Sequence, residues 1–219
     1  MPENQVSVTW LGHSMFLFSL NDTLKIVIDP YDDTVGYPLP KVTADIVLVS
    51  HRHFDHDNVK LVKGKPKVVD RDGTTSLKGI NFKGIPSVHD DKDGTLRGLN
   101  TIFVWEMGGM RFAHLGDLGV MLSSEQIKQI GAIDVLFSPI GGYFTIDAAT
   151  ATKIIDVLKP KAVFPMHYKT EVMSGSFPIA GVNDFLAGKK NVKRVGKNSI
   201  TLKRDELPAE TTIYVLNYK

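Results

Sequence analysis

The chain has 219 residues and a formal net charge of only +2, too small to indicate nucleic acid or a membrane surface as the main partner. Hydrophobic residues make up 42% and charged residues 23%, as is ordinary for a globular protein with a substantial core. Because cysteine is absent, disulfides, thiolate metal sites and a thiol nucleophile are excluded, and a metal site must use imidazole and carboxylate ligands.

The N-terminal part of the chain is predicted to be β structure. Apolar runs at residues 6–11 and 15–20 lead through a turn at Asn21-Asp22 to a further run at 24–28. The proline that follows shortly after this run cannot continue a strand ladder. Residues 44–50 are apolar almost throughout, which predicts a strand covered on both faces.

Strands and helices alternate in the rest of the chain. Further strands are predicted at residues 67–70, 79–88, 135–138, 162–165 and 211–218, and a hairpin through Gly108-Gly109 joins 101–106 to 110–115. Helices are predicted at residues 123–130, 147–158 and 183–187. Because the connections are short and no linker divides the chain, we predict one α/β domain over residues 1–219, with sheet layers sandwiched by helices.

Four potential metal ligands lie within six residues, directly after the apolar strand at 44–50. They are His51, His53, Asp55 and His56. Alternation along an extended segment would point the first three to one side, and a turn at Asp55 would send His56 to a neighbouring position. One ion can hardly take all four from so short a loop, whereas two adjacent ions can divide them. Imidazole and carboxylate ligands without thiolate suit zinc, manganese or iron.

Three more candidates share one kind of position. His89, Asp117 and His167 each lie just past the end of a predicted buried strand. Strand ends that meet at one sheet edge are where α/β proteins build their sites. Either histidine alone would equally suit a hydrogen-bonded core or surface position, but together with the cluster they favour one shared metal site.

The order and spacing of these seven residues resemble the metallo-β-lactamase superfamily. Trp10-Leu11-Gly12-His13-Ser14 and Pro165-Met166-His167-Tyr168 are similar to a branch of small metal-dependent hydrolases that resemble the L-ascorbate phosphate lactonases. The resemblance implies a four-layer αββα sandwich. It also implies a ligand set: His51, His53 and His89 for one metal ion, Asp55, His56 and His167 for a second, and Asp117 as a bridge between them.

The resemblance also gives a role to Asp29, which matches a family acid that supports a ligand histidine. A carboxylate that accepts the far imidazole N–H fixes the tautomer and raises the basicity of the ligand. The same Asp29 would also suit a turn before Pro30.

Two departures from the family pattern narrow the expected chemistry. Histidine at position 53 replaces the glutamate of the diiron oxygen-reducing branch, which favours hydrolysis over redox chemistry. Without cysteine, the chain also lacks the ligand of the best-known lactamases. We predict a hydrolase in which two divalent ions activate water to hydroxide for attack on a small ester, lactone or phosphoester. Zinc is the preferred metal, with manganese and iron as alternatives. Asp55 would orient this water and pass a proton to the leaving group.

Two alternatives stay open at this point. One is a phosphodiesterase or nuclease of the same superfamily, although no aromatic residues interleave with the basic ones between Phe185 and Tyr214 to form a stacking platform. The other is a non-catalytic metal-binding protein. Since no apolar run approaches the roughly 18 residues of a membrane span and no signal pattern begins the chain, we expect a small-molecule substrate and a cytoplasmic location. The oligomeric state is open.

Several features have two readings. His13, on a Gly-His-Ser turn, would contact the ligands or substrate, or bond to local backbone. His114 is expected to be structural or to support a ligand. Gly141-Gly142-Tyr143-Phe144 could shape a pocket or form a packing turn. The seven basic residues within 189–204 read as a solvated face, but beside the metals they would favour an anionic substrate.

Overall fold

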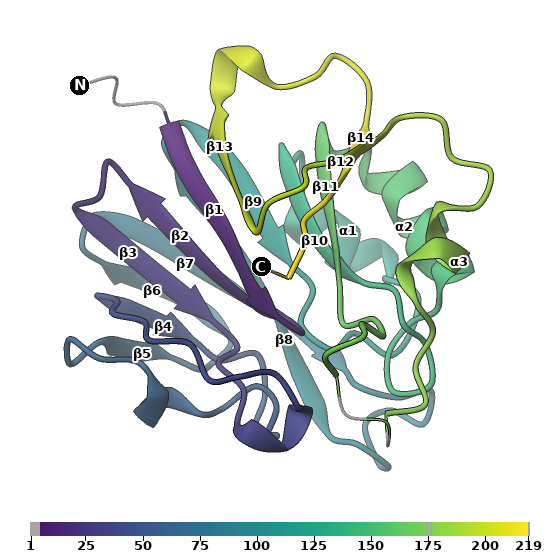
Figure 1. Cartoon of the computed structure of the whole chain (residues 1–219), viewed down its shortest axis with the longest axis horizontal. Coiled ribbons are helices and arrows are strands. Elements are labelled where there is room, and N and C mark those ends of the chain that lie inside the picture. Colours follow the sequence, from purple (N-terminus) through teal and green to yellow (C-terminus); the bar gives the residue numbers. More distant parts are fainter. Residues whose placement is uncertain (1–4, 174, 176, 219) are drawn as a thin grey trace.

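The computed structural model describes residues 5–173, 175 and 177–218, which form two mixed β-sheets packed face to face (Figure 1). The strands of the first sheet are β1 Gln5–Gly12, β2 Met15–Leu20, β3 Leu24–Ile28, β4 Ile46–Leu48, β5 Lys67–Val69 and β13 Ser199–Lys203. Their spatial order is β13-β1-β2-β3-β4-β5. The strands β1 to β3 and β13 pair antiparallel, whereas β3, β4 and β5 run parallel to one another.

The second sheet has eight strands. They are β6 Gly73–Leu77, β7 Ile80–Val88, β8 Leu99–Met107, β9 Met110–His114, β10 Val135–Pro139, β11 Ala162–Met166, β12 Val192–Arg194 and β14 Thr212–Val215. Their order is β12-β14-β11-β10-β9-β8-β7-β6. The neighbours among β6, β7, β8 and β9 pair antiparallel, whereas the neighbours among β9, β10, β11, β14 and β12 pair parallel.

The main core lies between the two sheets. In β1, burial alternates residue by residue, so Val6, Val8 and Trp10 face the interior. They join aromatic side chains of the second sheet such as Phe103 and Phe137 in one apolar cluster. Each fully buried side chain of this size contributes about 1.5–3 kcal/mol to folding relative to an exposed one. The core therefore holds the two sheets, and the loops at their ends, in a fixed relation.

The helices cover the outer face of the second sheet, as Figure 1 shows. They are α1 Ser124–Ile130, α2 Ala148–Leu158 and α3 Val182–Leu186. A capping box between Ser123 and Gln126 begins α1, and Lys159 in the left-handed conformation ends α2 before Pro160. The predicted helices are confirmed to within one or two residues. No helix in the described ranges is long and apolar enough to cross a membrane.

The outer face of the first sheet has a thinner cover. It consists of the 3-10 turns η1 Asp33–Val35 and η2 Val59–Leu61 with their flanking loops. Tyr31, Val35 and Val62 pack there against Val27 and Val47 in a second apolar cluster. The strands β3 and β4 are therefore buried on both faces, as the continuous apolar run in β4 predicts. The sandwich is confirmed, with this outer layer built of short turns and loops.

Both predicted hairpins are confirmed. Asn21 and Asp22 at the β2–β3 turn have φ of 50° and 57°, and Gly108 and Gly109 at the β8–β9 turn have φ of 59° and 69°. Positive φ at both central residues matches the twist of the flanking strands. The strands β6, β12 and β13 were not predicted, because they are short and polar residues make up most of each. The last two lie within the basic segment 189–204.

Candidate metal centre

The candidate site residues follow the ends of strands from both sheets, at one end of the sandwich. Asp29 follows β3, and the segment 51–56 follows β4 by two residues. In the second sheet, His89 follows β7, Asp117 lies three residues past β9, and His167 follows β11. The strand-end prediction thus holds for each candidate ligand, and the packed sheets bring these ends together.

The segment 51–56 is not extended, so the prediction that His51, His53 and Asp55 point to one side is wrong. These residues form bends and turns. The backbone N–H groups of His56 and Asp57 both donate to the carbonyl of His53, at 2.9 and 3.0 Å. This turn redirects the chain, so Asp55 and His56 do not follow the alternation of a strand. The His56 ring lies beside that of His51, with centroids 4.3 Å apart, and His51, His56 and Asp117 also form a group of ligand atoms within 4.8 Å of one another.

His51, His53 and His89 form a three-histidine group, with one ring nitrogen of each within 4.8 Å of the others. His51 Nε2 lies 3.0 Å from His53 Nδ1. Behind this pair, Ser50 Oγ donates to Asp29 Oδ2 at 2.8 Å and lies 3.0 Å from His51 Nδ1. Because the hydroxyl hydrogen goes to the carboxylate, His51 Nδ1 carries the proton and donates to Ser50. The lone pair of His51 Nε2 is therefore directed at the centre of the group.

A second, inner group consists of His13, Asp55, His56 and His167, whose ligand atoms again lie within 4.8 Å of one another. All four residues are buried. Asp55 Oδ2 lies 3.1 Å from His13 Nε2 and 3.7 Å from His56 Nε2. The rings of His13 and His167 have centroids 4.1 Å apart. The family resemblance assigned three of these residues to one ion, and the structure brings them together with His13 beside them.

Asp117 lies between the two groups. Its Oδ2 is 3.2 Å from His89 Nε2 and 3.1 Å from His167 Nε2, and its Oδ1 is 3.1 Å from His56 Nε2. Asn100 fixes the backbone by accepting from the Asp117 N–H at 2.9 Å. One carboxylate therefore contacts histidines of both groups, as a bridging ligand would.

Glycine before Asp117 permits this close packing. Gly116 has φ of 57°, and a Cβ there would lie 2.2 Å from Asn100 Oδ1 and 2.7 Å from the Ser50 Cβ. A side chain at position 116 would therefore displace the residues that hold Asp117 and His51 in place.

Asp29 supports both groups from behind. Its Oδ2 lies 2.9 Å from His56 Nδ1, and its two oxygens accept from the Ser50 N–H and hydroxyl at 2.8 Å each. The residue is fully buried with φ of 50°, a conformation uncommon for a non-glycine residue. Asp29 thus contacts His56 directly and His51 through Ser50, in the position that the resemblance predicted for it.

His13 and His114 differ in their partners. His13 Nε2 contacts Asp55, while its carbonyl accepts from the Trp10 indole at 2.9 Å. His114 Nε2 donates to the Ser14 carbonyl, and His114 Nδ1 accepts from the Gly116 N–H, both at 3.1 Å. Both ring nitrogens of His114 are thereby used by backbone groups, and Nδ1 also lies 3.9 Å from Asp29 Oδ2, which agrees with either role predicted for it. The His13 ring instead contacts the candidate ligand Asp55, which favours the predicted role beside the ligands over a bond to local backbone.

The electrostatics of the site favour cation binding. Burial lowers the pKa of His51 to about 3, and burial together with His167 lowers that of His13 to about 4, so both imidazoles are neutral at pH 7. Burial opposes ionisation of Asp117 and Asp55, yet the facing histidines hold the pKa of each carboxyl below its usual value. Burial likewise disfavours charge on His56, but Asp117, Asp55 and Asp29 outweigh it and raise its pKa well above the usual value.

Several buried polar atoms of the site lack a hydrogen bond of good geometry within the described ranges. They include both ring nitrogens of His56 and His167 and Oδ1 of Asp117. Three carboxylates, Asp29, Asp55 and Asp117, are also buried together. Buried charges and lone pairs of this kind are costly unless they are paired or coordinate a metal. The donor set, all N and O, therefore fits divalent metal ions.

A cavity of about 380 Å³ opens onto the site. Candidate ligands on its wall are His53, Asp55, His89 and Asp117. The other lining residues are Arg52, Arg97, Phe54, Phe144 and Phe177. Phe144 belongs to the Gly-Gly-Tyr-Phe segment, so this segment does shape a pocket. None of the seven basic residues of 189–204 lines this cavity.

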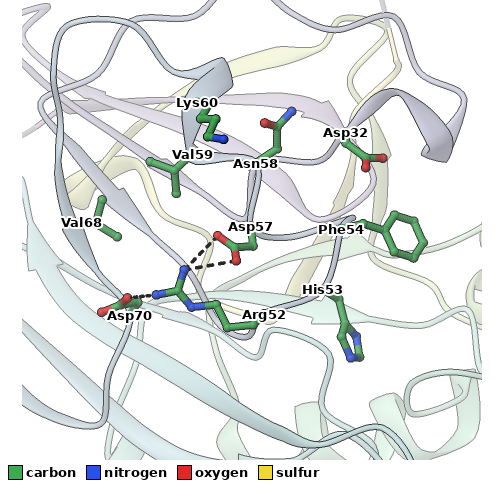
Figure 2. Close-up of a pocket in the computed structure, with 10 residues that line it drawn as sticks. All are labelled: Asp32, Arg52, His53, Phe54, Asp57, Asn58, Val59, Lys60, Val68 and Asp70. Carbon is green, nitrogen blue, oxygen red and sulfur yellow. Dashed lines mark hydrogen bonds and ion pairs between the residues drawn. The ribbon is translucent and has the colours of Figure 1, made fainter.

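A second cavity, of about 640 Å³, is also lined by residues 52–54. Figure 2 shows the Arg52 side chain extending toward Asp57 and Asp70 and away from His53. Arg52 Nη1 lies 3.1 Å from Asp57 Oδ1, and Nη2 pairs with Asp70. These ion pairs connect the turn that carries His53 to the end of β5.

The comparisons with known proteins agree with this geometry. Residues 7–167 match the model of the β-lactamase superfamily domain. The chain belongs to the β-lactamase superfamily. Superfamily members named UPF0173 metal-dependent hydrolases are 32% identical in Archaeoglobus fulgidus and 34% identical in Thermus thermophilus. Each alignment covers 75% of this chain and 84% of the relative.

A solved structure from Thermotoga maritima, described as a candidate Zn-dependent hydrolase of the metallo-β-lactamase superfamily, is 39% identical with a TM-score of 0.79. The match covers 96% of this chain and 98% of that one. The superfamily and its sandwich fold are thus confirmed. The narrower resemblance to the L-ascorbate phosphate lactonases stays a prediction.

Proposed function

We propose that this superfamily member binds two divalent metal ions and hydrolyses a small ester, lactone or phosphoester. Zinc is the first candidate for both ions, followed by manganese or iron. The observation that supports the proposal is that the ligand atoms form a three-histidine group and an inner group, and that Asp117 forms a further group with one histidine of each, His51 and His56. His51, His53 and His89 would hold one ion, and Asp55, His56 and His167 the other, with Asp117 between them.

In the proposed reaction, the metal ions would activate water, and protein side chains would orient it and transfer protons. Divalent ions held by these residues would supply Lewis-acid chemistry, since metal binding lowers the pKa of water from 15.7 toward about 7 and stabilises developing negative charge. Asp55 lies at the cavity wall, and its contact with His13 fixes the orientation of the carboxylate. Asp55 would orient the attacking water, accept its proton and return that proton to the leaving group.

The shape of the site supports an enzyme rather than a closed metal-binding protein. Four candidate ligands line the cavity, so solvent and substrate reach the centre. Structural metal sites are instead saturated by protein atoms, whereas catalytic sites keep an open position. At about 380 Å³, the cavity has the size of a small-molecule site. Both observations favour a small substrate over an oligonucleotide.

The test combines metal analysis with a substrate panel. The purified protein is assayed for bound metal, then against lactones, esters and phosphodiesters after addition of zinc, manganese or iron. We expect two equivalents of metal and turnover of at least one class. Protein that binds none of these ions, and stays inactive with all of them, would contradict the proposal.

The role of Asp55 is tested separately. We expect Asp55→Ala to abolish turnover, by roughly 10²–10⁴-fold for the loss of a proton-transferring group, while the three-histidine group still binds its ion. A near-normal rate with metal present would remove Asp55 from the mechanism.

A further inference from the structure

Arg97 lines the cavity beside the candidate ligands and has an unpaired guanidinium. Within the described ranges, its side chain makes no hydrogen bond and no ion pair. The other arginine of the cavity, Arg52, is neutralised by Asp57 and Asp70. Arg97 is only partly exposed. Arg97 is therefore the positively charged side chain of this cavity that has no carboxylate partner in the described part of the chain.

The loop between β7 and β8 holds Arg97 in place. The carboxylate of Asp90 accepts four backbone N–H groups of this loop, at 2.7–3.0 Å, from Lys92, Gly94, Leu96 and Arg97. The loop also closes on a candidate ligand, because the His89 N–H donates to the Gly98 carbonyl at 3.1 Å. Arg97 is thus built into a rigid loop that begins at His89, which fixes its position relative to the metal centre.

The surroundings of Arg97 are aromatic. Its guanidinium carbon lies 5.5 Å from the centroid of the Phe144 ring. Phe177 connects this ring to Phe54, with centroids 6.2 and 6.4 Å away. This cation–π contact favours a position of the guanidinium over the Phe144 ring and leaves its hydrogen-bond donors unsatisfied. The cavity therefore combines one oriented cation, an apolar wall and the candidate metal ligands.

We propose that Arg97 binds an anionic group of the substrate, a carboxylate or phosphate, while an apolar part of the same substrate packs on Phe54, Phe144 and Phe177. A guanidinium presents a planar set of donors that matches a carboxylate or phosphate with two parallel hydrogen bonds. The substrate class is then a small ester or lactone that carries a separate anion and an aryl or alkyl group. This assignment rests on the proposed function, because the cleaved bond is placed at the metal centre.

The first test measures binding without turnover. The metal-loaded protein is titrated with 3-phenylpropionate and with its neutral isostere 3-phenylpropanamide, and a further titration uses phenylphosphonate as the phosphate-like anion. We expect the carboxylate or the phosphonate to bind at least about tenfold more tightly than the amide, the effect of a hydrogen-bonded charge pair. The anion with the larger preference identifies the group that Arg97 accepts.

The Arg97→Gln variant decides whether this preference belongs to Arg97 or to the metal ions. We expect the ratio of anion to amide affinity to fall by about tenfold in Arg97→Gln and to be partly retained in Arg97→Lys. Arg204→Gln is the matched control, because it removes the same charge from an exposed residue of η3 Arg204–Glu206 that does not line the cavity. Since the ratio is measured within each variant, a fraction of misfolded protein does not alter it.

The outcomes separate this inference from the proposed function. An unchanged ratio in Arg97→Gln, or equal binding of anion and amide by the unmodified protein, would overturn the role of Arg97 even if the protein hydrolyses esters. If Arg97→Gln loses the preference for the anion over the amide, but the unmodified protein hydrolyses none of the substrates, Arg97 remains the anion site and the proposed hydrolysis is rejected. With an active protein, kcat/KM for anionic esters should fall in Arg97→Gln at least about tenfold more than kcat/KM for neutral esters.

Discussion

The two ligand groups of this site differ in exposure and in support. In the three-histidine group, His53 is only partly buried, and both His53 and His89 line the cavity. In the inner group, His13, His56 and His167 are at most 1% exposed. The three-histidine group thus meets the cavity through two histidines, whereas the inner group meets it through Asp55 alone and keeps its histidines buried.

The supporting residues follow the same division. In the inner group, Asp29 supports His56 from outside the group, and the member His13 contacts Asp55. In the three-histidine group, Ser50 is the support of His51. Supporting contacts fix tautomers and ring orientations, and their loss commonly lowers metal affinity or activity 10–100-fold. We therefore expect substitutions behind the two groups to have different effects on metal affinity and on rate.

The largest effect is expected for Asp117→Asn, because Asp117 belongs to both groups. The substitution keeps the shape but removes the negative charge that faces the histidines on either side. We expect kcat to fall on the order of 10²–10³-fold, as for other preorganised electrostatic contacts, and the affinity for both ions to fall. Metal analysis and steady-state kinetics measure the two effects. Retention of two tightly bound ions would show that Asp117 does not bridge them.

Asp29→Asn should weaken the inner group more than the three-histidine group. The change removes the carboxylate beside His56 Nδ1, while an amide oxygen can still accept from Ser50. We expect a 10–100-fold loss of affinity for one of the two ions. Isothermal titration of metal-free protein, with both binding steps resolved, measures it. Equal weakening of both steps would contradict the asymmetry.

His13→Asn should change the rate more than the metal content. Asparagine tolerates the left-handed conformation that His13 adopts with φ of 52°, so the turn should be preserved. Since His13 orients Asp55, we expect kcat to fall about tenfold with both ions retained. His114→Asn serves as the structural comparison: it should lower thermal stability instead of kcat. If His13→Asn releases an ion, His13 is itself a ligand of the inner group.

The smallest effect is expected for Ser50→Ala. The substitution removes one hydroxyl between Asp29 and His51 and leaves the remaining contact of Asp29 with His56 in place. A hydrogen bond of this kind contributes about 1 kcal/mol, so the three-histidine group should lose about fivefold in metal affinity. The same titration used for Asp29→Asn measures it. A larger effect on the inner group would reverse the proposed division of supports.

Much of the site could be predicted because the ligand types and strand ends are both visible in the sequence. His89 and His167 directly follow buried strands. A residue directly after a strand can be placed at the sheet edge without predicting the conformation of the loop that follows. The role of Asp29 came from a family resemblance, and its contact with His56 agrees with it. The arrangement of the segment 51–56 was predicted wrongly, because its turn depends on backbone hydrogen bonds to His53 that residue alternation does not encode.

The supporting residues were missed for a different reason. Ser50, Asn100 and Asp90 are common polar types, and their roles depend on which backbone and side-chain atoms lie near them after folding. The hydroxyl directly before the first ligand, Ser50, was the one local signal that could have been used. The basic segment 189–204 agrees with its default interpretation as a solvated face, since none of its seven basic residues lines the cavity. The two arginines that do line it, Arg52 and Arg97, were not singled out from the sequence.

The central claim is that two ions share Asp117, and one measurement tests it most directly. Metal-free protein is loaded with zinc and crystallised, and anomalous scattering at the zinc edge locates each ion. The account predicts two ions per chain, one held by His51, His53 and His89, the other by Asp55, His56 and His167, with an oxygen of Asp117 coordinating both. A single ion at saturation, or a second ion away from the inner group, would contradict it.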